Sequence, residues 1–95
     1  MKFSFTAEMA NRIQGEKSPE KKEQLLISFM DFVLNDEALV KGMECDLIHI
    51  AMTECSHTAR FYAIEDKQLK TEVNAALREA GYKVSSNKDY ITVSF

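Results

Sequence analysis

The C-terminal stretch Arg60–Phe95, RFYAIEDKQLKTEVNAALREAGYKVSSNKDYITVSF, decides the fold class of this chain. Its first residues, Arg60–Ile64, favour an extended strand. Apolar residues with helical spacing follow from Leu69 to Ala80, and Gly81 is a typical helix stop. Asp66 is a natural N-cap, so we expect a helix over Lys67–Ala80. The wet side of this helix is predicted to carry Lys70, Glu72, Asn74, Arg78 and Glu79.

Two short alternating segments after the glycine, Tyr82–Val84 and Ile91–Phe95, predict a β-hairpin. The intervening Ser85–Asp89 is too long for a two-residue turn, and we expect Asn87 to adopt a left-handed conformation there. The residues predicted to share the covered face are Tyr82, Val84, Ile91, Val93 and Phe95. Those predicted to face outward are Lys83, Tyr90, Thr92 and Ser94. For the strand before the helix, the pattern does not decide which face points inward.

Upstream of residue 59 the sequence has helical periodicity and predicts three helices. Thr6 is the expected N-cap of a helix over Ala7–Gln14, and Ser18 precedes a helix over Pro19–Leu34. The apolar arc of this second helix is wide, so we expect it to be buried on more than one side. A third helix is predicted over Glu37–Glu54.

The third helix has apolar residues on two sides. Its main face comprises Leu39, Val40, Met43, Leu47, Ile50 and Ala51. Ile48 and Met52 lie away from that face, beside Cys45 and His49. A helix that is apolar on two sides is central or contacts a partner. We therefore expect an interaction surface at Cys45, Ile48, His49 and Met52, used by a partner protein or by a second copy. We expect the C-terminal strand to form a sheet edge, which is a second such surface.

Length and composition are those of one ordinary globular domain. The chain has 95 residues, of which 45% are hydrophobic and 28% charged. We expect a single α+β domain over residues 1–95. Its architecture is about three N-terminal helices followed by strand, helix and β-hairpin. The small three-stranded sheet, antiparallel or mixed, is expected to be covered by helices.

The charge balance disfavours nucleic acid as a partner. Twelve basic and 15 acidic residues give a formal charge of −3, whereas proteins that track phosphates usually carry a basic face. The basic cluster of the helical half comprises Arg12, Lys17, Lys21 and Lys22. Glutamates are interleaved with it, which is typical of a solvated helix face. No apolar run reaches the length of a membrane span, and Met1–Phe5 does not resemble a signal peptide. We expect a cytoplasmic protein with reduced cysteines.

The spacing Cys45-x3-His49-x5-Cys55-x-His57 is the one pattern that suggests a metal. Cys45 and His49 are one helical turn apart and could share a zinc ion, which Cys55 and His57 could complete. The combined spacing matches no common zinc module, and free cysteine is often a small buried hydrophobe. A structural role is therefore favoured, and we expect no metal and no cofactor. Neither Cys/His pair has a flanking oxyanion turn or an orienting third residue, so we expect no enzyme.

The C-terminal block resembles a recurrent type of small bacteriophage-encoded protein of unknown function. In that type a short strand precedes a helix that ends in a leucine-rich stretch and Gly-Tyr-x-Val, and an Ile/Val-rich strand closes the chain. The matching residues are Leu77–Val84 and Ile91–Phe95, and Phe5–Met9 is faintly similar to the openings of those proteins. Here Phe95 ends the chain where Trp is more common. The resemblance implies a phage origin and this fold, and it carries over no catalytic residue.

These observations together predict a non-enzymatic phage-like accessory protein that acts by protein–protein interaction in the cytoplasm of the infected bacterium. A host factor or a defence component is the kind of partner that we expect it to modulate. The alternative is a nucleic-acid-associated regulator that uses the helical half, and a further alternative is a small zinc-binding protein.

Overall fold

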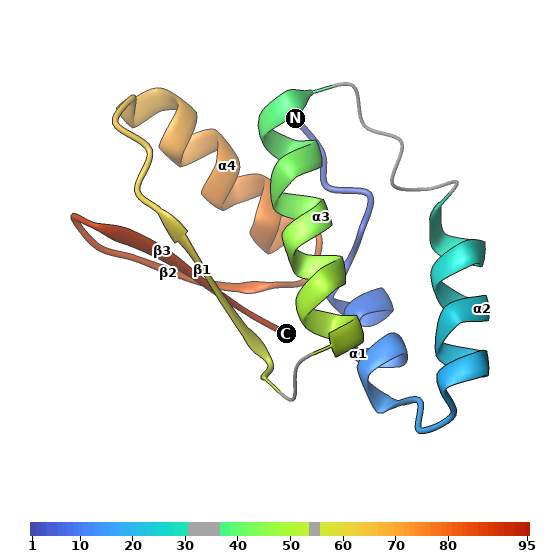
Figure 1. Ribbon diagram of the computed structural model, residues 1–95. Helices are drawn as coiled ribbons and strands as arrows, with labels where there is room; N and C mark the ends of the chain where they lie inside the picture. The colour runs from blue at the N-terminus through green and yellow to red at the C-terminus, as the bar shows by residue number, and fades with distance from the viewer. Residues whose placement is uncertain (31–36, 54–55) are drawn as a thin grey trace.

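The computed structural model describes residues 1–30, 37–53 and 56–95, and the described part is an α+β fold, as predicted (Figure 1). The elements, in chain order, are α1 (Ala7–Gly15), α2 (Pro19–Met30), α3 (Ala38–Thr53), β1 (Thr58–Tyr62), α4 (Lys67–Glu79), β2 (Lys83–Ser86) and β3 (Tyr90–Ser94). No helix in these ranges is both long enough and apolar enough to span a membrane.

The helix α1 begins where the sequence predicts. The Thr6 hydroxyl oxygen accepts a hydrogen bond from the Met9 amide at 3.3 Å, which satisfies one of the free donors of the first turn. The helix ends at Gly15, one residue later than expected. Its buried residues, Ala7, Ala10 and Ile13, recur every three residues and form the stripe that faces the core.

The helix α2 lies at the edge of the molecule (Figure 1). It begins at Pro19 as predicted; residues 31–34 of the predicted helix lie outside the described ranges. The expectation that it is buried on more than one side is wrong for the described part, where Phe29 alone is buried and the side chain of Ile27 is 64% exposed. The reason is tertiary: α2 packs chiefly against α1, so one stripe is covered.

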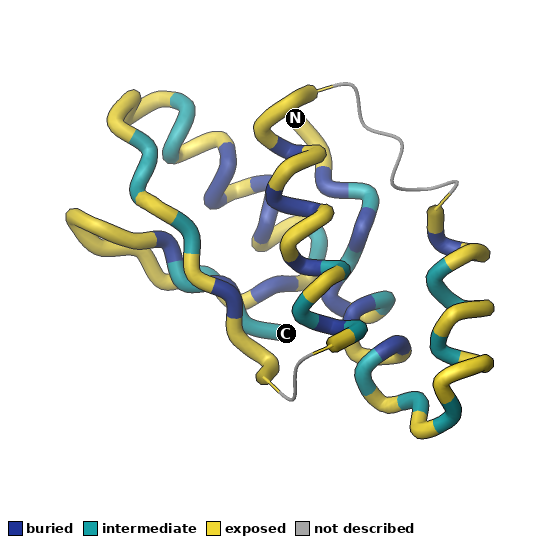
Figure 2. Tube along the Cα trace, viewed as in Figure 1, coloured by how far each residue is buried: buried dark blue, intermediate teal, exposed yellow. Residues whose placement is uncertain are grey.

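The helix α3 is the central element, packing against α1 and β1. Four residues of its predicted main face are fully or nearly fully buried: Val40, Met43, Leu47 and Ala51. Leu39 is 39% exposed and Ile50 is half-buried. Residue 54, where the sequence predicts that the helix ends, lies outside the described ranges. Figure 2 shows the buried residues of α3 and α4 lying towards the middle of the molecule.

The sheet is antiparallel with strand order β1-β3-β2, and so its C-terminal strand is central. The expectation of an edge strand at the C-terminus is therefore wrong. The hairpin partner β2 occupies one side of β3, and β1 pairs along the other side, with Ala59 opposite Val93 and Phe61 opposite Ile91. The edges of this sheet are β1 and β2.

The structure decides the inward face of β1, which the sequence left open. The strand begins at Thr58, two residues earlier than predicted, and Ala59 is 2% exposed while Phe61 is half-buried. Arg60 and Tyr62 point outward. The hairpin faces agree with the prediction, since Ile91 and Val93 of β3 are fully buried and Tyr90 is exposed.

The end of α4 forms a Schellman motif. Gly81 has a φ of 95° and donates to the Arg78 carbonyl, while the Tyr82 amide donates to the Leu77 carbonyl at 3.1 Å. The predicted N-cap is also present, because the Asp66 carboxylate accepts from the Leu69 amide at 3.0 Å. The predicted boundaries of this helix are therefore confirmed to within one residue.

Two further predictions in the C-terminal half are wrong. Asn87 does not adopt a left-handed conformation, because its side-chain oxygen accepts from the amides of Asp89 and Tyr90, each at 2.8 Å, and closes the turn with an ordinary backbone. Asn74, placed on the wet side of α4, is only 9% exposed. It lies against β2 and donates to the Ser86 hydroxyl at 3.3 Å.

The N-terminal segment is part of the core rather than a loose end. Phe3 and Phe5 are 2% and 0% exposed, and the Ala7 amide donates to the Ala80 carbonyl at 3.0 Å. The first residue of α1 is therefore hydrogen-bonded to the residue that follows α4, which is more than 70 residues later in the chain.

A buried carboxyl group holds this segment against α3. The Glu44 side chain is fully buried, and its Oε1 accepts hydrogen bonds from the amides of Ser4 and Phe5. Its Oε2 is buried without a partner among the described residues. Burial raises the pKa of Glu44, and the two hydrogen bonds oppose that shift without cancelling it.

Tyr82 makes a second polar contact with the same segment. Its hydroxyl donates to the Phe5 carbonyl at 2.6 Å, and its ring is buried. Burial, together with the negative charge of Glu44, raises the pKa of the phenol, which therefore stays neutral and keeps donating.

Candidate functional site

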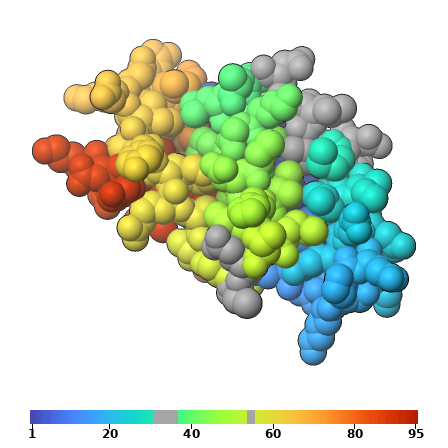
Figure 3. All heavy atoms as spheres, in the orientation of Figure 1, coloured from blue at the N-terminus to red at the C-terminus, as the bar shows by residue number. Residues whose placement is uncertain are grey.

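A groove between α3 and β1 is the candidate site. We call it the α3–β1 groove; it has a volume of about 310 Å³. Its lining residues are Ala38, Leu39, Gly42, Met43, Asp46, Phe61, Tyr62, Ile64 and Ile91. Figure 3 shows α3 and β1 side by side at the surface of the molecule. Among the residues that line the groove, Asp46 alone carries a charge.

Helical and strand periodicity together bring these residues to one place. Leu39, Gly42, Met43 and Asp46 are three or four positions apart, so they share one side of α3. The inward-facing Phe61 supplies the opposite wall from β1. The polar end of the groove is formed by Asp46, which has no hydrogen-bond or ion-pair partner among the described residues.

Gly42 has no structural reason to be a glycine. It lies inside α3 with an ordinary helical backbone, and a Cβ built there would meet no described atom within 4 Å outside the local helix backbone. A glycine in a helix interior lowers stability by about 1 kcal/mol relative to alanine. What the missing side chain provides is room, because residue 42 lies in the wall of the groove.

The predicted interaction residues lie elsewhere on α3. Cys45 and His49 are exposed, whereas Ile48 and Met52 are half-buried and pack against the core. The Lys22 ammonium donates to the Met52 carbonyl at 3.2 Å and so reaches across the end of α3. These four residues therefore present a polar strip with two partly covered apolar side chains, next to the groove but not lining it.

The residues of the zinc pattern are not brought together by the described part of the chain. Cys45, His49 and His57 are exposed, and Cys55 lies outside the described ranges. The His57 ring packs edge-on against Phe95 with centroids 5.8 Å apart. In residues 1–30, 37–53 and 56–95, no three His, Cys, Asp or Glu side chains are grouped to hold a metal ion.

The open face of the sheet carries a polar aromatic cluster that the sequence reasoning missed. Tyr62 lies on the strand whose inward face the sequence left open, and its side chain is 84% exposed. Its ring stacks on that of Tyr90, which lies directly opposite in the register, with centroids 5.9 Å apart. The guanidinium of Arg60 lies over the Tyr90 ring at 5.0 Å from its centroid. Arg60 could have indicated this face in the sequence, since a charged side chain on one face of a strand indicates that this face is exposed to solvent.

The buried Glu44 is not a candidate catalytic group. Its carboxyl group is inaccessible to solvent and its one bonded oxygen is occupied by main-chain amides, so a substrate could not reach it. General acid–base catalysis requires hydrogen-bond reach to the reacting group.

Comparison of the chain with family models, with curated proteins and with solved structures finds no match.

Proposed function

We propose that this protein is a non-enzymatic interaction module that binds a partner protein in the α3–β1 groove. The observation that carries the proposal is Gly42, which leaves an apolar recess open on the wall of the central helix although alanine would stabilise that helix. Recesses with apolar walls at the protein surface are typical of interaction sites.

The chemistry of the groove favours a protein side chain over a small metabolite. Small-molecule sites use several convergent polar groups to fix the orientation of the ligand. The lining here offers the Asp46 carboxylate and otherwise mainly apolar surface, with Leu39, Met43 and Phe61 as its walls. The occupant that fits best is one large aliphatic or aromatic side chain of the partner, next to a lysine or arginine that pairs with Asp46.

The wider biological assignment rests on the resemblance of the C-terminal block to small phage proteins. We propose a phage-like accessory protein whose partner is a host factor or a defence component. For the nucleic-acid regulator that uses the helical half, the structure gives little support: Lys22 is engaged with the Met52 carbonyl and Arg12 lies over the Phe29 ring at 5.6 Å. A zinc protein is likewise not favoured by any grouping of side chains in the described ranges.

The decisive experiment fills the groove without disturbing the fold. Gly42→Leu places a side chain into the recess, and Gly15→Leu is the matched control, because a Cβ at Gly15 also meets nothing within 4 Å and the site lies outside the groove. Tagged proteins are used to capture partners from host lysate, and each captured protein is then purified and titrated. We expect a partner that binds the parent and Gly15→Leu but not Gly42→Leu.

Asp46→Lys gives the electrostatic half of the test, because like-charge repulsion should weaken binding of the same partner. Added salt screens that repulsion, so it should partly restore binding to this variant, whereas it weakens binding to the parent. A partner that binds all four proteins equally would show that the groove is not the site. If no partner is captured and the parent protein runs as a monomer at all concentrations, the interaction function itself is refuted.

A further inference from the structure

The sheet has one covered face and one open face. On the covered side lie α4 and the apolar residues of the strands, and no described helix covers the other side (Figure 1). The outward residues of the three strands are Thr58, Arg60, Tyr62, Lys83, Ser85, Tyr90, Thr92 and Ser94. We call this set the open sheet face. It contains two cations, four hydroxyl side chains and two tyrosines, and it contains no carboxylate.

The charge of this face is opposite in sign to that of the whole chain. The chain has a net charge of −3, yet the outward residues of the sheet carry Arg60 and Lys83 and no acid. At the hairpin end Lys88 and Lys70 lie near the face, together with Asp89 and Glu65. Asp46, which lines the α3–β1 groove together with Tyr62, is a further carboxylate at the α3 side of the face. Negative groups are therefore at the rim, and a polyanion that lies across the strands, away from α3, meets no carboxylate.

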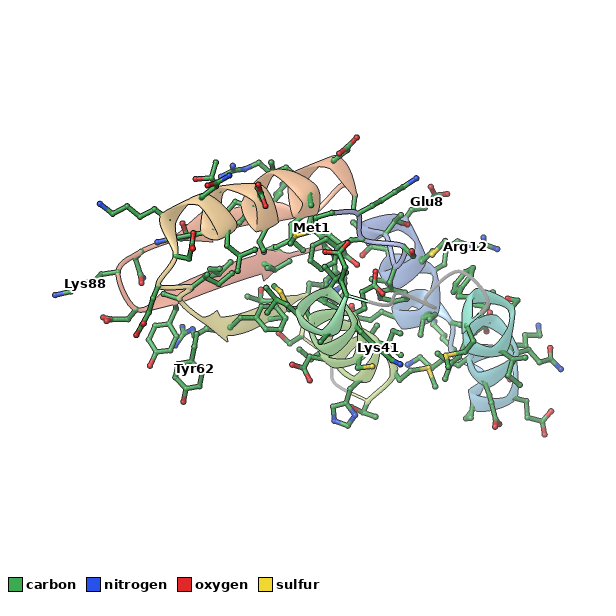
Figure 4. All side chains as sticks on the ribbon, turned by 90° about the horizontal axis from the view of Figure 1, so that it is seen from above. Met1, Glu8, Arg12, Lys41, Tyr62 and Lys88 are labelled. Carbon is green, nitrogen blue, oxygen red and sulfur yellow. The ribbon has the colours of Figure 1, made fainter. Side chains whose placement is uncertain are left out.

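The tyrosines offer a ring for stacking. Tyr62 and Tyr90 are already stacked at an interplanar angle of 28°, and Tyr62, at 84% exposed, is the outer member of the pair. Figure 4 shows the Tyr62 side chain projecting away from the ribbon. Since Tyr90 and the Arg60 guanidinium support each other at 5.0 Å, the pair is held in place before any ligand arrives.

We propose that the open sheet face binds single-stranded nucleic acid without strong sequence preference. A base stacks on the free face of Tyr62, and Arg60 and Lys83 contact the backbone phosphates. Single-strand binders combine exposed aromatic rings with a cationic track in this way. A duplex keeps its bases stacked inside and offers no free base to Tyr62, so the same surface discriminates against it. The inference is independent of the α3–β1 groove, although Tyr62 also borders that groove.

The binding test uses fluorescein-labelled oligo(dT) and oligo(rU) of about 15 nucleotides, a length near the upper end of single-module sites. Fluorescence anisotropy is measured at about 50 and about 200 mM salt, with a duplex of the same length as competitor. Tyr62→Ala is expected to weaken binding about 5- to 150-fold, the usual effect of losing one base–aromatic stack. Tyr62→Phe keeps the ring and is expected to bind like the parent.

Two charge variants locate the contact. Arg60→Gln should weaken binding and reduce the slope of log affinity against log salt by about 0.7, the value for one phosphate contact on a single strand. Lys21→Glu combined with Lys22→Glu changes the charge by more, but on α2, and should leave binding unchanged. Tyr62 is exposed, so we expect its variants to have the circular dichroism spectrum and the urea midpoint of the parent. If a Tyr62 variant is misfolded, Thr92→Asp on the same face is tested in its place.

Tyrosine fluorescence gives a direct readout. The chain has no tryptophan and three tyrosines, of which Tyr82 is buried, so quenching by unlabelled oligo(dT) reports on Tyr62 and Tyr90. Quenching in the parent that is lost in Tyr62→Ala supports the proposal. The proposal is overturned by any of three results: no oligonucleotide binding at low salt, equal affinity for duplex, or loss of binding in the α2 double variant with Tyr62→Ala unaffected. If this face binds a protein partner instead of nucleic acid, the expected result is that no oligonucleotide binds at low salt.

Discussion

The buried carboxyl group of Glu44 allows the sharpest prediction about stability. Two main-chain amides, those of Ser4 and Phe5, donate to its Oε1, while its Oε2 is buried without a described partner. Glu44→Ala removes the acceptor of both amides. A buried donor left without an acceptor costs about 1–3 kcal/mol, and Ser4, which is half-exposed, falls at the low end because water can reach it.

Adding about 1 kcal/mol for the lost methylene contacts, we expect Glu44→Ala to reduce the free energy of unfolding by about 3–5 kcal/mol. A domain of this size has a total stability of about 5–14 kcal/mol, so this is a large fraction of it. Glu44→Gln keeps an oxygen acceptor at the same place and is neutral. We therefore expect it to lose about 1 kcal/mol or less at acidic pH.

The pH dependence separates the charge of Glu44 from its hydrogen bonds. Because burial raises the pKa of Glu44 in the folded state above its ordinary value near 4.5, the unfolded chain releases this proton first as pH rises. The group's contribution to stability is therefore largest below that ordinary value and is lost as pH rises towards the folded pKa. Glu44→Gln lacks this loss, so its stability relative to the parent should increase with pH.

The assay is urea unfolding followed by circular dichroism for parent, Glu44→Gln and Glu44→Ala at a series of pH values between about 4 and 8. Phe29→Leu on α2 is a control core substitution, since it should shift stability equally at every pH. Parallel pH profiles for the parent and Glu44→Gln would refute the reasoning about the buried charge. An alanine variant as stable as the glutamine variant would refute the role of the two amides.

Three further predictions concern the glycines and Tyr82, each measured by urea unfolding. Gly81→Ala should lower stability by about 1–2 kcal/mol, because φ is 95° and the new Cβ would lie 3.4 Å from that of Ala7; an unchanged midpoint would contradict this. Tyr82→Phe should lower it by about 1–3 kcal/mol by orphaning the Phe5 carbonyl, and a neutral effect would show that water replaces the hydroxyl. Gly42→Ala should raise it by about 1 kcal/mol, whereas a loss would mean that the groove is closed in solution.

Local signals in the chain were sufficient for the secondary structure. Thr6 and Asp66 each cap a helix at the predicted position, and Gly81 ends α4 in a Schellman motif, because capping depends on hydrogen bonds over only a few residues. The error at Asn87 is also local in origin. The turn can be closed either by a left-handed backbone or by the asparagine side chain, and both use the same residue type.

Most of the residue contacts that form the candidate sites could not be predicted from the sequence. Periodicity placed Leu39 and Met43 on one side of a helix. That β1 lies beside them and leaves a groove depends on the pairing of β1 with β3, which is distant in the chain. Sequence favoured Cys45, Ile48, His49 and Met52 because apolar residues on a second helix side suggest a contact. In the fold, Ile48 and Met52 are partly taken up by the core.

The α+β class, the order of helices and strands, the N-caps of α1 and α4 and the inward face of the hairpin could be read from the sequence, since these follow from propensity, hydrophobic period and capping over short spans. Tertiary structure alone decided that β3 is the central strand, that Glu44 lies buried against the N-terminal segment, and that Tyr62 and Tyr90 meet on an open face. The physical reason is that burial, pKa and cross-strand pairing depend on which distant residues come together. A strand with Arg60 and Tyr62 on one side and Ala59 and Phe61 on the other can bury either side until its neighbours are known.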